Sequence, residues 1–171
     1  MSGDVHVRFC EGGGVRFPSA TRRVLVRLPT GKEYYYLPRE LYSVAALTDE
    51  TGAITEAATY DTYGQVAMYD QTATSVPQSE IGNVYYFTGR RLDLLPTASS
   101  PQPAAKQLYH YRAREYDPGN GRFMQRDPIA NRCTQAIDQL VSLYEYVGSS
   151  PLRLVDPTGL VCQGCQSPKQ P

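Results

Sequence analysis

The four cysteines are the first residues whose type and spacing could carry chemistry. Two of them form a CxxC pair near the C-terminal end, and the other two lie far from it: Cys10, Cys133, Cys162 and Cys165. A tetrahedral zinc site needs two more ligands beside such a pair, and His6 and His110 are distant and unpaired in the sequence. A redox CxxC normally opens a helix, which lowers its thiol pKa, whereas this pair lies in a polar segment of Gly, Gln and Pro. We therefore expect no metal, no cofactor and no disulfide framework.

A second group that could carry chemistry is a basic block over residues 90–126. It contains Arg90, Arg91, Lys106, Arg112, Arg114, Arg122 and Arg126, whereas no Lys or Arg lies between Arg39 and Arg90. Polyanion binding is one interpretation of this block. Pairing with nearby carboxylates, such as Glu115, Asp117 and Asp127, is the simpler one. Because 17 Lys and Arg balance 17 Asp and Glu, the chain lacks the basic excess typical of nucleic-acid binding.

Tyrosine is the over-represented aromatic residue. The chain has 14 Tyr, 4 Phe and no Trp, together with 14 Gly and 13 Pro. Tyr favours strands in which one face packs and the hydroxyl reaches a partner or water. A carbohydrate-stacking surface is an alternative, but cross-strand packing explains these residues without a ligand. The composition therefore indicates a turn-rich, mainly β protein.

The elements that must position these residues are short antiparallel hairpins. Residues 24–28 and 34–37 flank a Pro-Thr-Gly turn, and residues 43–48 and 53–60 flank a D-x-x-G turn that recurs twelve residues later at 61–64. Asp bonds to the backbone that follows it and Gly takes the positive φ that such turns need. Residues 138–147 have helical periodicity, with Asp138 as a cap and Gly148 as an end signal. We predict antiparallel hairpins that form a curved sheet, with a short helix near 138–147.

The sequence also bears on location. No segment approaches the ~18 apolar residues of a membrane span. The most apolar run near the start of the chain, residues 24–28, is interrupted by Arg27, so we expect no signal peptide. The residues alone leave the location and the oligomeric state open.

Several motifs together resemble a known family. YHYRAREYDPGNGRFMQRDPIA (109–130) and SLYEYVGSSPLRLVDPTGL (142–160) resemble the RHS repeat-associated core, the C-terminal module of RHS/YD-repeat proteins, which include bacterial polymorphic toxins. LYSVAALTDETGAITEAATYDTYGQV (41–66) resembles a YD repeat, and YYFTGRRLD (85–93) resembles the segment that leads into the core. The resemblance implies hairpins wound into a hollow shell around a toxin, with the core sealing one end. It also implies a secreted or cell-surface setting.

This resemblance divides the chain into five parts. We expect a poorly defined N-terminal segment over 1–33, YD-like hairpin repeats over 34–94 and a loop rich in Pro, Ser and Ala over 95–106. The core would span 107–160, followed by a short variable tail over 161–171.

The resemblance also implies a chemical role for two aspartates. In shell-forming members the core resembles an aspartyl protease that cuts its own chain, and the matching residues are Asp127 in DPIA and Asp156 in DPTGL. Cleavage would fall between Leu160 and Val161. Two carboxylates held close share one proton, so that one is a base and the other an acid. Carboxylates more than about 8 Å apart could not do so.

The chain departs from the family pattern in three ways. Ala130 stands where the family has Gly, the spacer over 131–155 is longer than in the family, and the residues after Leu160 number only eleven. An Asp before Pro is also a common turn opener, as at Asp117, for which the family implies no role.

Three hypotheses follow. The leading one is a truncated RHS core module with a structural or interaction role, no toxin domain of its own and no enzyme activity. Its partners would be other RHS-repeat segments or a fuller RHS shell. The second is the self-cleaving aspartyl protease, and the third is an orphan cassette without function.

Overall fold

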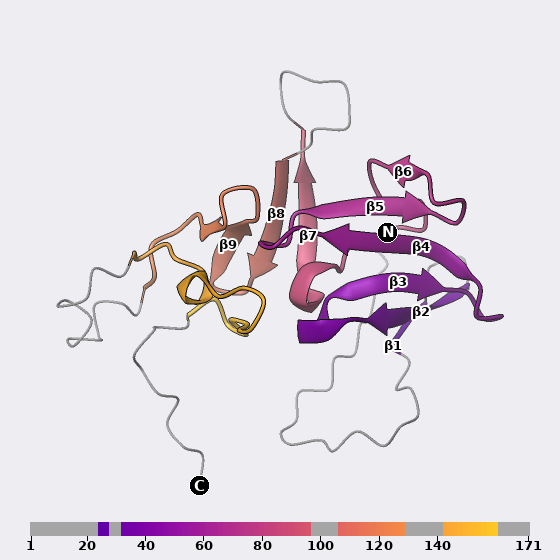
Figure 1. Ribbon diagram of the computed structural model, residues 1–171, viewed down its shortest axis with the longest axis horizontal. Helices are drawn as coiled ribbons and strands as arrows, with labels where there is room; N and C mark the ends of the chain where they lie inside the picture. Colours follow the sequence, from indigo (N-terminus) through magenta and orange to yellow (C-terminus); the bar gives the residue numbers. More distant parts are fainter. Residues whose placement is uncertain (1–23, 28–31, 97–105, 129–141, 161–171) are drawn as a thin grey trace, which may run out of the picture.

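Two antiparallel sheets make up most of the structure. The computed structural model describes residues 24–27, 32–96, 106–128 and 142–160 (Figure 1). The first sheet has six strands in sequence order: β1 (Val24–Arg27), β2 (Glu33–Pro38), β3 (Val44–Thr48), β4 (Ile54–Tyr60), β5 (Val66–Asp70) and β6 (Ser75–Val76). Each strand pairs with the next, so the predicted hairpins and the mainly β fold are confirmed.

Three aspartates build the same turn in this sheet. Asp49 Oδ1 accepts hydrogen bonds from the N–H groups of Thr51 (2.9 Å) and Ala53 (3.0 Å). Asp61 and Asp70 repeat this pattern with the residues two and four positions later. The sequence predicted only the first two turns, because the third lacks Gly: Ala73 takes φ +60° where Gly52 takes +88° and Gly64 +94°.

The second sheet has four strands. These are β7 (Arg91–Leu95), β8 (Lys106–Tyr111), β9 (Arg114–Asp117) and β10 (Arg122–Phe123), in the order β10-β9-β8-β7. In Figure 1, β7 and β8 run across the direction of β3, β4 and β5. The two sheets therefore meet at an angle rather than as one continuous sheet.

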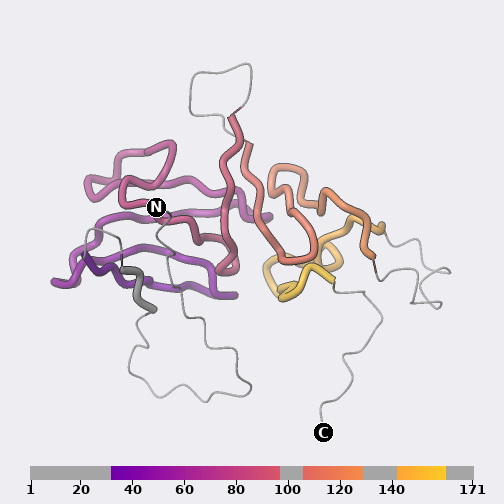
Figure 2. Tube along the Cα trace, turned by 180° about the vertical axis from the view of Figure 1, so that it is seen from behind, coloured from indigo at the N-terminus to yellow at the C-terminus, as the bar shows by residue number. Residues whose placement is uncertain are grey.

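Irregular segments cover both edges of the second sheet. Leu92 of β7 donates its N–H to Val84 O (2.7 Å), and Tyr85 forms an isolated bridge with Arg91. On the other edge, Phe123 of β10 donates its N–H to Tyr144 O (2.8 Å). By contrast, no strand among the described residues pairs with the outer edge of β1. Figure 2 shows the segment 142–160, in yellow, beside the end of the second sheet.

The predicted helix over 138–147 is wrong in the part that the structure describes. Residues 138–141 lie outside the described ranges, and the backbone at 144–145 is used in pairing with β10. The 3₁₀ turn η4 (Val147–Ser149) follows, with φ +39° at Val147 and +61° at Gly148, which a right-handed helix does not allow. Helical spacing was misleading because Tyr146 is buried by the second sheet and not by a helix face.

The main core is aromatic. Its rings include Phe87, Tyr109, Tyr111, Tyr116, Phe123 and Tyr146, and those in contact have centroids 4.4–6.5 Å apart. Two of the hydroxyls bond to the Asp61 turn, since Tyr109 donates to Gly64 O (2.9 Å) and Tyr116 to Tyr63 O (2.8 Å). The predicted packing role of Tyr is thus confirmed, and these bonds join the two sheets. Among the described residues, no helix is long and apolar enough to cross a membrane.

Candidate functional site

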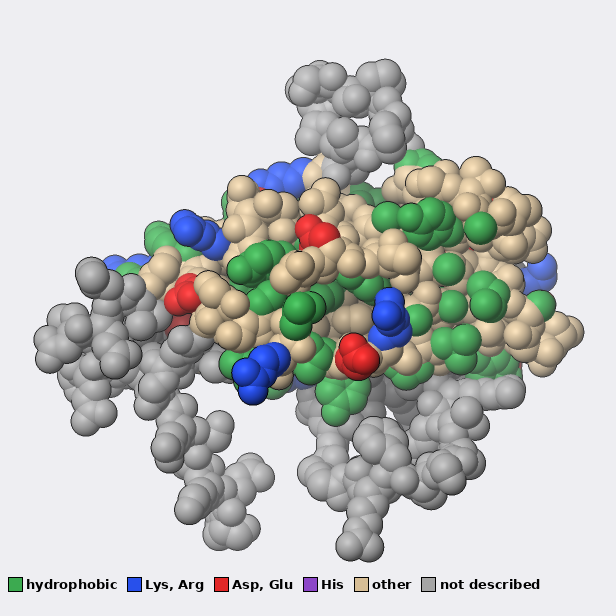
Figure 3. All heavy atoms as spheres, in the orientation of Figure 1, with side chains coloured by type: hydrophobic (Ala, Val, Ile, Leu, Met, Phe, Trp, Pro, Cys, Tyr) green, Lys and Arg blue, Asp and Glu red, His purple; other side chains and the backbone are tan. Residues whose placement is uncertain are grey.

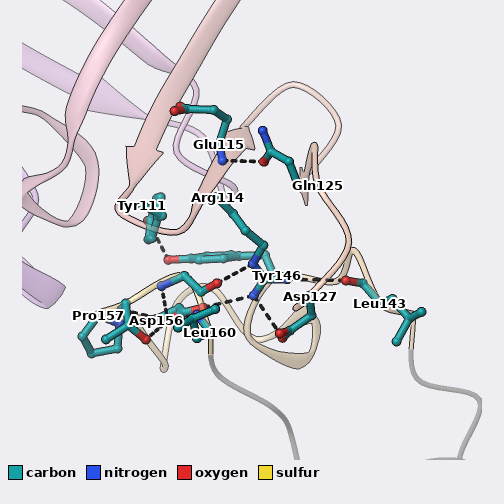
Figure 4. Close-up of polar contacts among 12 residues, drawn as sticks. Tyr111, Arg114, Glu115, Gln125, Asp127, Leu143, Tyr146, Asp156, Pro157 and Leu160 are labelled. Carbon is teal, nitrogen blue, oxygen red and sulfur yellow. Dashed lines mark hydrogen bonds and ion pairs between the residues drawn. The ribbon is translucent and has the colours of Figure 1, made fainter. Parts of the chain in front are cut away.

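A buried arginine lies at the centre of the candidate site (Figure 4). Arg114, the first residue of β9, is 3% exposed, and its guanidinium carbon lies 3.6 Å from the centre of the Phe123 ring. Burial lowers the pKa of Arg114, and the neighbouring carboxylates of Asp127 and Asp156 oppose that shift. Because an Arg keeps its proton even so, a full positive charge is held beside the aromatic core.

Both sequence-predicted aspartates converge on this one charge. Asp127 Oδ2 lies 3.3 Å and Asp156 Oδ2 lies 3.4 Å from the same Arg114 nitrogen, Nη2. Asp127 is 7% exposed and Asp156 only 1%. The two carboxylate oxygens are therefore no farther apart than the sum of those distances, which is below the limit of about 8 Å for sharing a proton. The structure brings the predicted pair together; its catalytic role stays a prediction.

Asp156 also organises the turn that carries the predicted cleavage site. Its Oδ1 accepts hydrogen bonds from the N–H groups of Thr158 (3.0 Å), Gly159 (2.8 Å) and Leu160 (3.3 Å). Gly159 has φ +72°, and a Cβ there would lie 2.3 Å from Tyr111 O. The 156–160 turn is thus fixed by a side chain at its start and by a position that only glycine fits.

Further contacts hold this turn against the second sheet. Arg114 Nε donates to Gly159 O, and Ala113 N–H donates to Thr158 O (3.3 Å). Arg90 Nη2 donates to Pro157 O, and its guanidinium carbon lies 5.0 Å from the centre of the Tyr111 ring. Both residues belong to the basic block, for which the sequence predicted pairing with nearby carboxylates such as Asp127. It did not predict the contacts with Asp156, which lies 66 residues after Arg90 and 42 residues after Arg114, because no local pattern indicates such pairs.

The basic block is otherwise spread out. Lys106 pairs with Asp117 (3.0 Å), His110 with Glu115 (2.8 Å) and Arg91 with Asp93 (2.8 Å). The predicted pairing of the basic block with nearby carboxylates is confirmed for Lys106, Arg91 and Arg114. On the face drawn in Figure 3, Lys and Arg side chains are scattered over the surface.

Part of the long spacer lies beside Asp127. Asp127 N–H donates to Leu143 O over 3.0 Å, so Asp127 lies beside a residue in the second half of the spacer. Extra length in this segment therefore does not separate Asp127 from Asp156. Ala130 and Val161 lie outside the described ranges, and Leu160 is the last residue of the described part.

This arrangement differs from an acid–base pair in one respect. Here both carboxylates contact the same guanidinium nitrogen of Arg114, whereas the two carboxylates of a catalytic dyad lie against one another. Within the described ranges, no three His, Cys, Asp or Glu side chains are placed to hold a metal ion. All four cysteines lie outside those ranges.

Comparisons with known proteins give similar matches over three quarters of the chain. It is 30% identical over 129 residues to "Salivary gland surface protein 1" of Aedes aegypti, a match that covers 75% of this chain and 3% of that protein. It is 29% identical over 128 residues to "tRNA nuclease WapA" of Bacillus subtilis strain 168, covering 75% of this chain and 5% of that protein. No protein-family model matches the chain.

Solved structures match over a similar share of the chain. A crystal structure of TcdB2-TccC3 has a TM-score of 0.56 and 27% identity, covering 76% of this chain and 5% of that one. TcdB2-TccC3 without its hypervariable C-terminal region has a TM-score of 0.53 and 26% identity. This chain thus spans only a small fraction of the length of the proteins it resembles.

Proposed function

Given an RHS-related fold, shared with the RHS-type proteins TcdB2-TccC3 and WapA, we propose that this chain is a structural and interaction module of an RHS system. In this proposal, the six-stranded sheet belongs to a curved array of hairpin repeats. The second sheet and residues 142–160 form the core that closes one end of the array. The partner is a further run of RHS repeats or a fuller RHS shell.

The observation that carries this proposal is the difference between sheet edges. Both edges of the second sheet are occupied by irregular backbone at 84–85 and 144–145, which cannot be extended by another strand. In the six-stranded sheet, the outer edges of β1 and β6 have no described strand beside them, and an open edge is a template for strand addition. With four residues against two, β1 offers the longer edge. A further hairpin repeat therefore fits at β1 and not on the second sheet.

A binding experiment with edge variants tests this proposal. Full-length WapA of Bacillus subtilis, immobilised as the binding partner, should retain this chain. Successive N–H groups of a strand point to opposite edges, so one of Val24 and Leu25 donates outward. Proline at that residue removes the outward donor. One of the two variants should lose binding at least about tenfold, whereas proline at the exposed turn residue Glu50 should not. Equal retention of all three variants would place the interface elsewhere.

Self-cleavage by Asp127 and Asp156 is the second candidate, because both carboxylates contact Arg114 and the Leu160 N–H bonds to Asp156. The intact mass of purified chain tests it. A species that ends at Leu160 and disappears on Asp156→Asn would support the protease. Persistent full-length chain would leave Asp156 as a turn organiser, the role that its hydrogen bonds and its pairing with Arg114 favour.

A further inference from the structure

The turn between β9 and β10 exposes an Asn–Gly pair. Asn120 is exposed and lies between Gly119 and Gly121, so no neighbouring side chain shields its carboxamide carbon, Cγ. An open hollow of about 380 Å³ lies at this turn, and its lining includes Asn120, Asp117 and Tyr144. Water therefore reaches the carboxamide directly.

We propose that Asn120 is a modification site at which the chain deamidates spontaneously. The backbone nitrogen of Gly121 bonds to Cγ of Asn120 and gives up its proton. The Cγ–Nδ2 bond breaks, and the nitrogen leaves with that proton as ammonia. Water then opens the resulting succinimide to aspartate or isoaspartate. Glycine favours the ring closure because it has no Cβ to obstruct the approach.

Two hydrogen bonds restrain the reacting groups in the folded chain. The Gly121 N–H donates to Pro118 O over a long 3.3 Å, and Asn120 Nδ2 donates to Asp117 Oδ2 over 2.7 Å. Both lie in a surface turn beside a two-residue strand, and such segments open with little free energy. The fold therefore slows the reaction without blocking it.

The product alters the environment of Asp117. This carboxylate is 4% exposed and pairs with Lys106 Nζ at 3.0 Å. Deamidation replaces the donating NH₂ group of Asn120 with a second carboxylate, so two negative charges share one ammonium group. Like charges at this distance repel one another, and the Asp117 turn loses a hydrogen bond at the same time.

An isoaspartate has a further effect, since it adds a backbone carbon to the turn. Gly121 packs against the ring of Tyr63, where even a Cβ would come within 2.8 Å. Tyr63 belongs to the Asp61 turn, and its carbonyl accepts the Tyr116 hydroxyl. The longer backbone shifts Gly121 against this ring and so loosens the joint between the two sheets. This inference stands apart from the proposed function and does not depend on it.

Peptide mapping of the full chain tests the site. After incubation at neutral pH, Asn120 should convert at a rate within about tenfold of the same chain unfolded in urea. Asn83 is the internal control, because it is buried, precedes Val84 and bonds to Tyr85 through both its amide groups. Asn120 still intact in the folded chain when the unfolded chain has converted would overturn the proposal.

Two variants test the consequence. Asn120→Asp supplies the aspartate product, and hydrogen exchange should become faster in β10 and in residues 61–65. Asn120→Gln keeps an amide but disfavours the five-membered ring, so it should stay unmodified and exchange as the wild type does. Equal exchange in Asn120→Asp and Asn120→Gln, together with unchanged exchange in the aged wild type, would show that the joint does not depend on this turn.

Discussion

Two kinds of aspartate turn occur in this molecule, and they differ in the use of the second carboxylate oxygen. In the exposed turns at Asp49, Asp61 and Asp70, Oδ1 accepts backbone N–H bonds and shapes a hairpin. In the buried turn at Asp156, Oδ1 does the same work, while Oδ2 contacts Arg114. Local sequence specifies the first oxygen's bonds. Only the tertiary fold specifies the contact of the second oxygen, Oδ2. That contact with Arg114 distinguishes the candidate site at Asp156 from the purely structural turns.

The largest effect is expected from removing the shared cation. Arg114→Met keeps the length of the side chain but removes the positive charge that both buried carboxylates contact, which should cost about 3–5 kcal/mol of unfolding free energy. Chemical denaturation measures it. Arg122→Met, an exposed position on the neighbouring strand, is the matched control. Equal stability of Arg114→Met and Arg122→Met would mean that the charged contact with Arg114 does not stabilise the buried turn.

High pH should destabilise the aromatic core that lies beside the buried turn. Burial raises the pKa of Tyr146, whose ring packs in the aromatic core, to about 12. The folded state therefore holds a proton that the unfolded state releases near pH 10, so the stabilisation is complete below pH 10 and lost as the pH rises towards 12. The loss is about 2–3 kcal/mol for this residue. Unfolding curves at increasing pH measure this loss of unfolding free energy. Unchanged stability between pH 10 and pH 12 would contradict the raised pKa of Tyr146.

A charge-removing pair compares the two turns directly. Asp156→Asn retains an oxygen for the turn but loses the charged contact with Arg114, which should cost about 2 kcal/mol. Asp49→Asn makes the same change in an exposed turn and should alter the midpoint of unfolding little. A double variant with Arg114→Met should show coupling for Asp156 only. Similar losses at Asp49 and Asp156 would remove the distinction between the turns.

The smallest effect concerns the exposed turns alone. Ala73→Gly relieves a positive φ and should stabilise the chain by about 0.5–1 kcal/mol. Gly52→Ala, which meets open space at its Cβ position, should cost about the same amount. Because both turns share one hydrogen-bond pattern, thermal unfolding of the two variants should shift in opposite directions. Shifts of the same sign would show that the positive φ at Gly52 and Ala73 does not determine the stability of these turns.

The sequence predicted those parts of the fold that depend on near neighbours. The hairpins around the turns at Asp49 and Asp61 follow from Asp and Gly at fixed spacing. The turn at Asp70 was missed because Ala73 occupies the glycine position. In the segment that leads into the core, Tyr85 forms an isolated bridge with Arg91 of β7 before the 3₁₀ turn η2 (Phe87–Gly89).

The candidate site likewise has residues that the sequence predicted and contacts that it did not. Asp127 and Asp156 were predicted from a family pattern, and the fold brings them together. The pairing of Arg114 with Asp127 was predicted because the two residues are near one another in the chain. Its contact with Asp156 was not, because that residue follows much later. Periodicity failed at Tyr146 for a similar reason, since the residue is buried by non-local aromatic packing.

The order of strands in the six-stranded sheet has a consequence for synthesis. Every strand from β1 to β6 pairs with its neighbour in sequence, so each hairpin can form as soon as its two strands leave the ribosome, and local contacts of this kind form quickly. The covering of β10 must wait for residues 144–145, and the contacts of Arg114 must wait for Asp156. The contacts around Arg114 therefore form later than the hairpins of the six-stranded sheet.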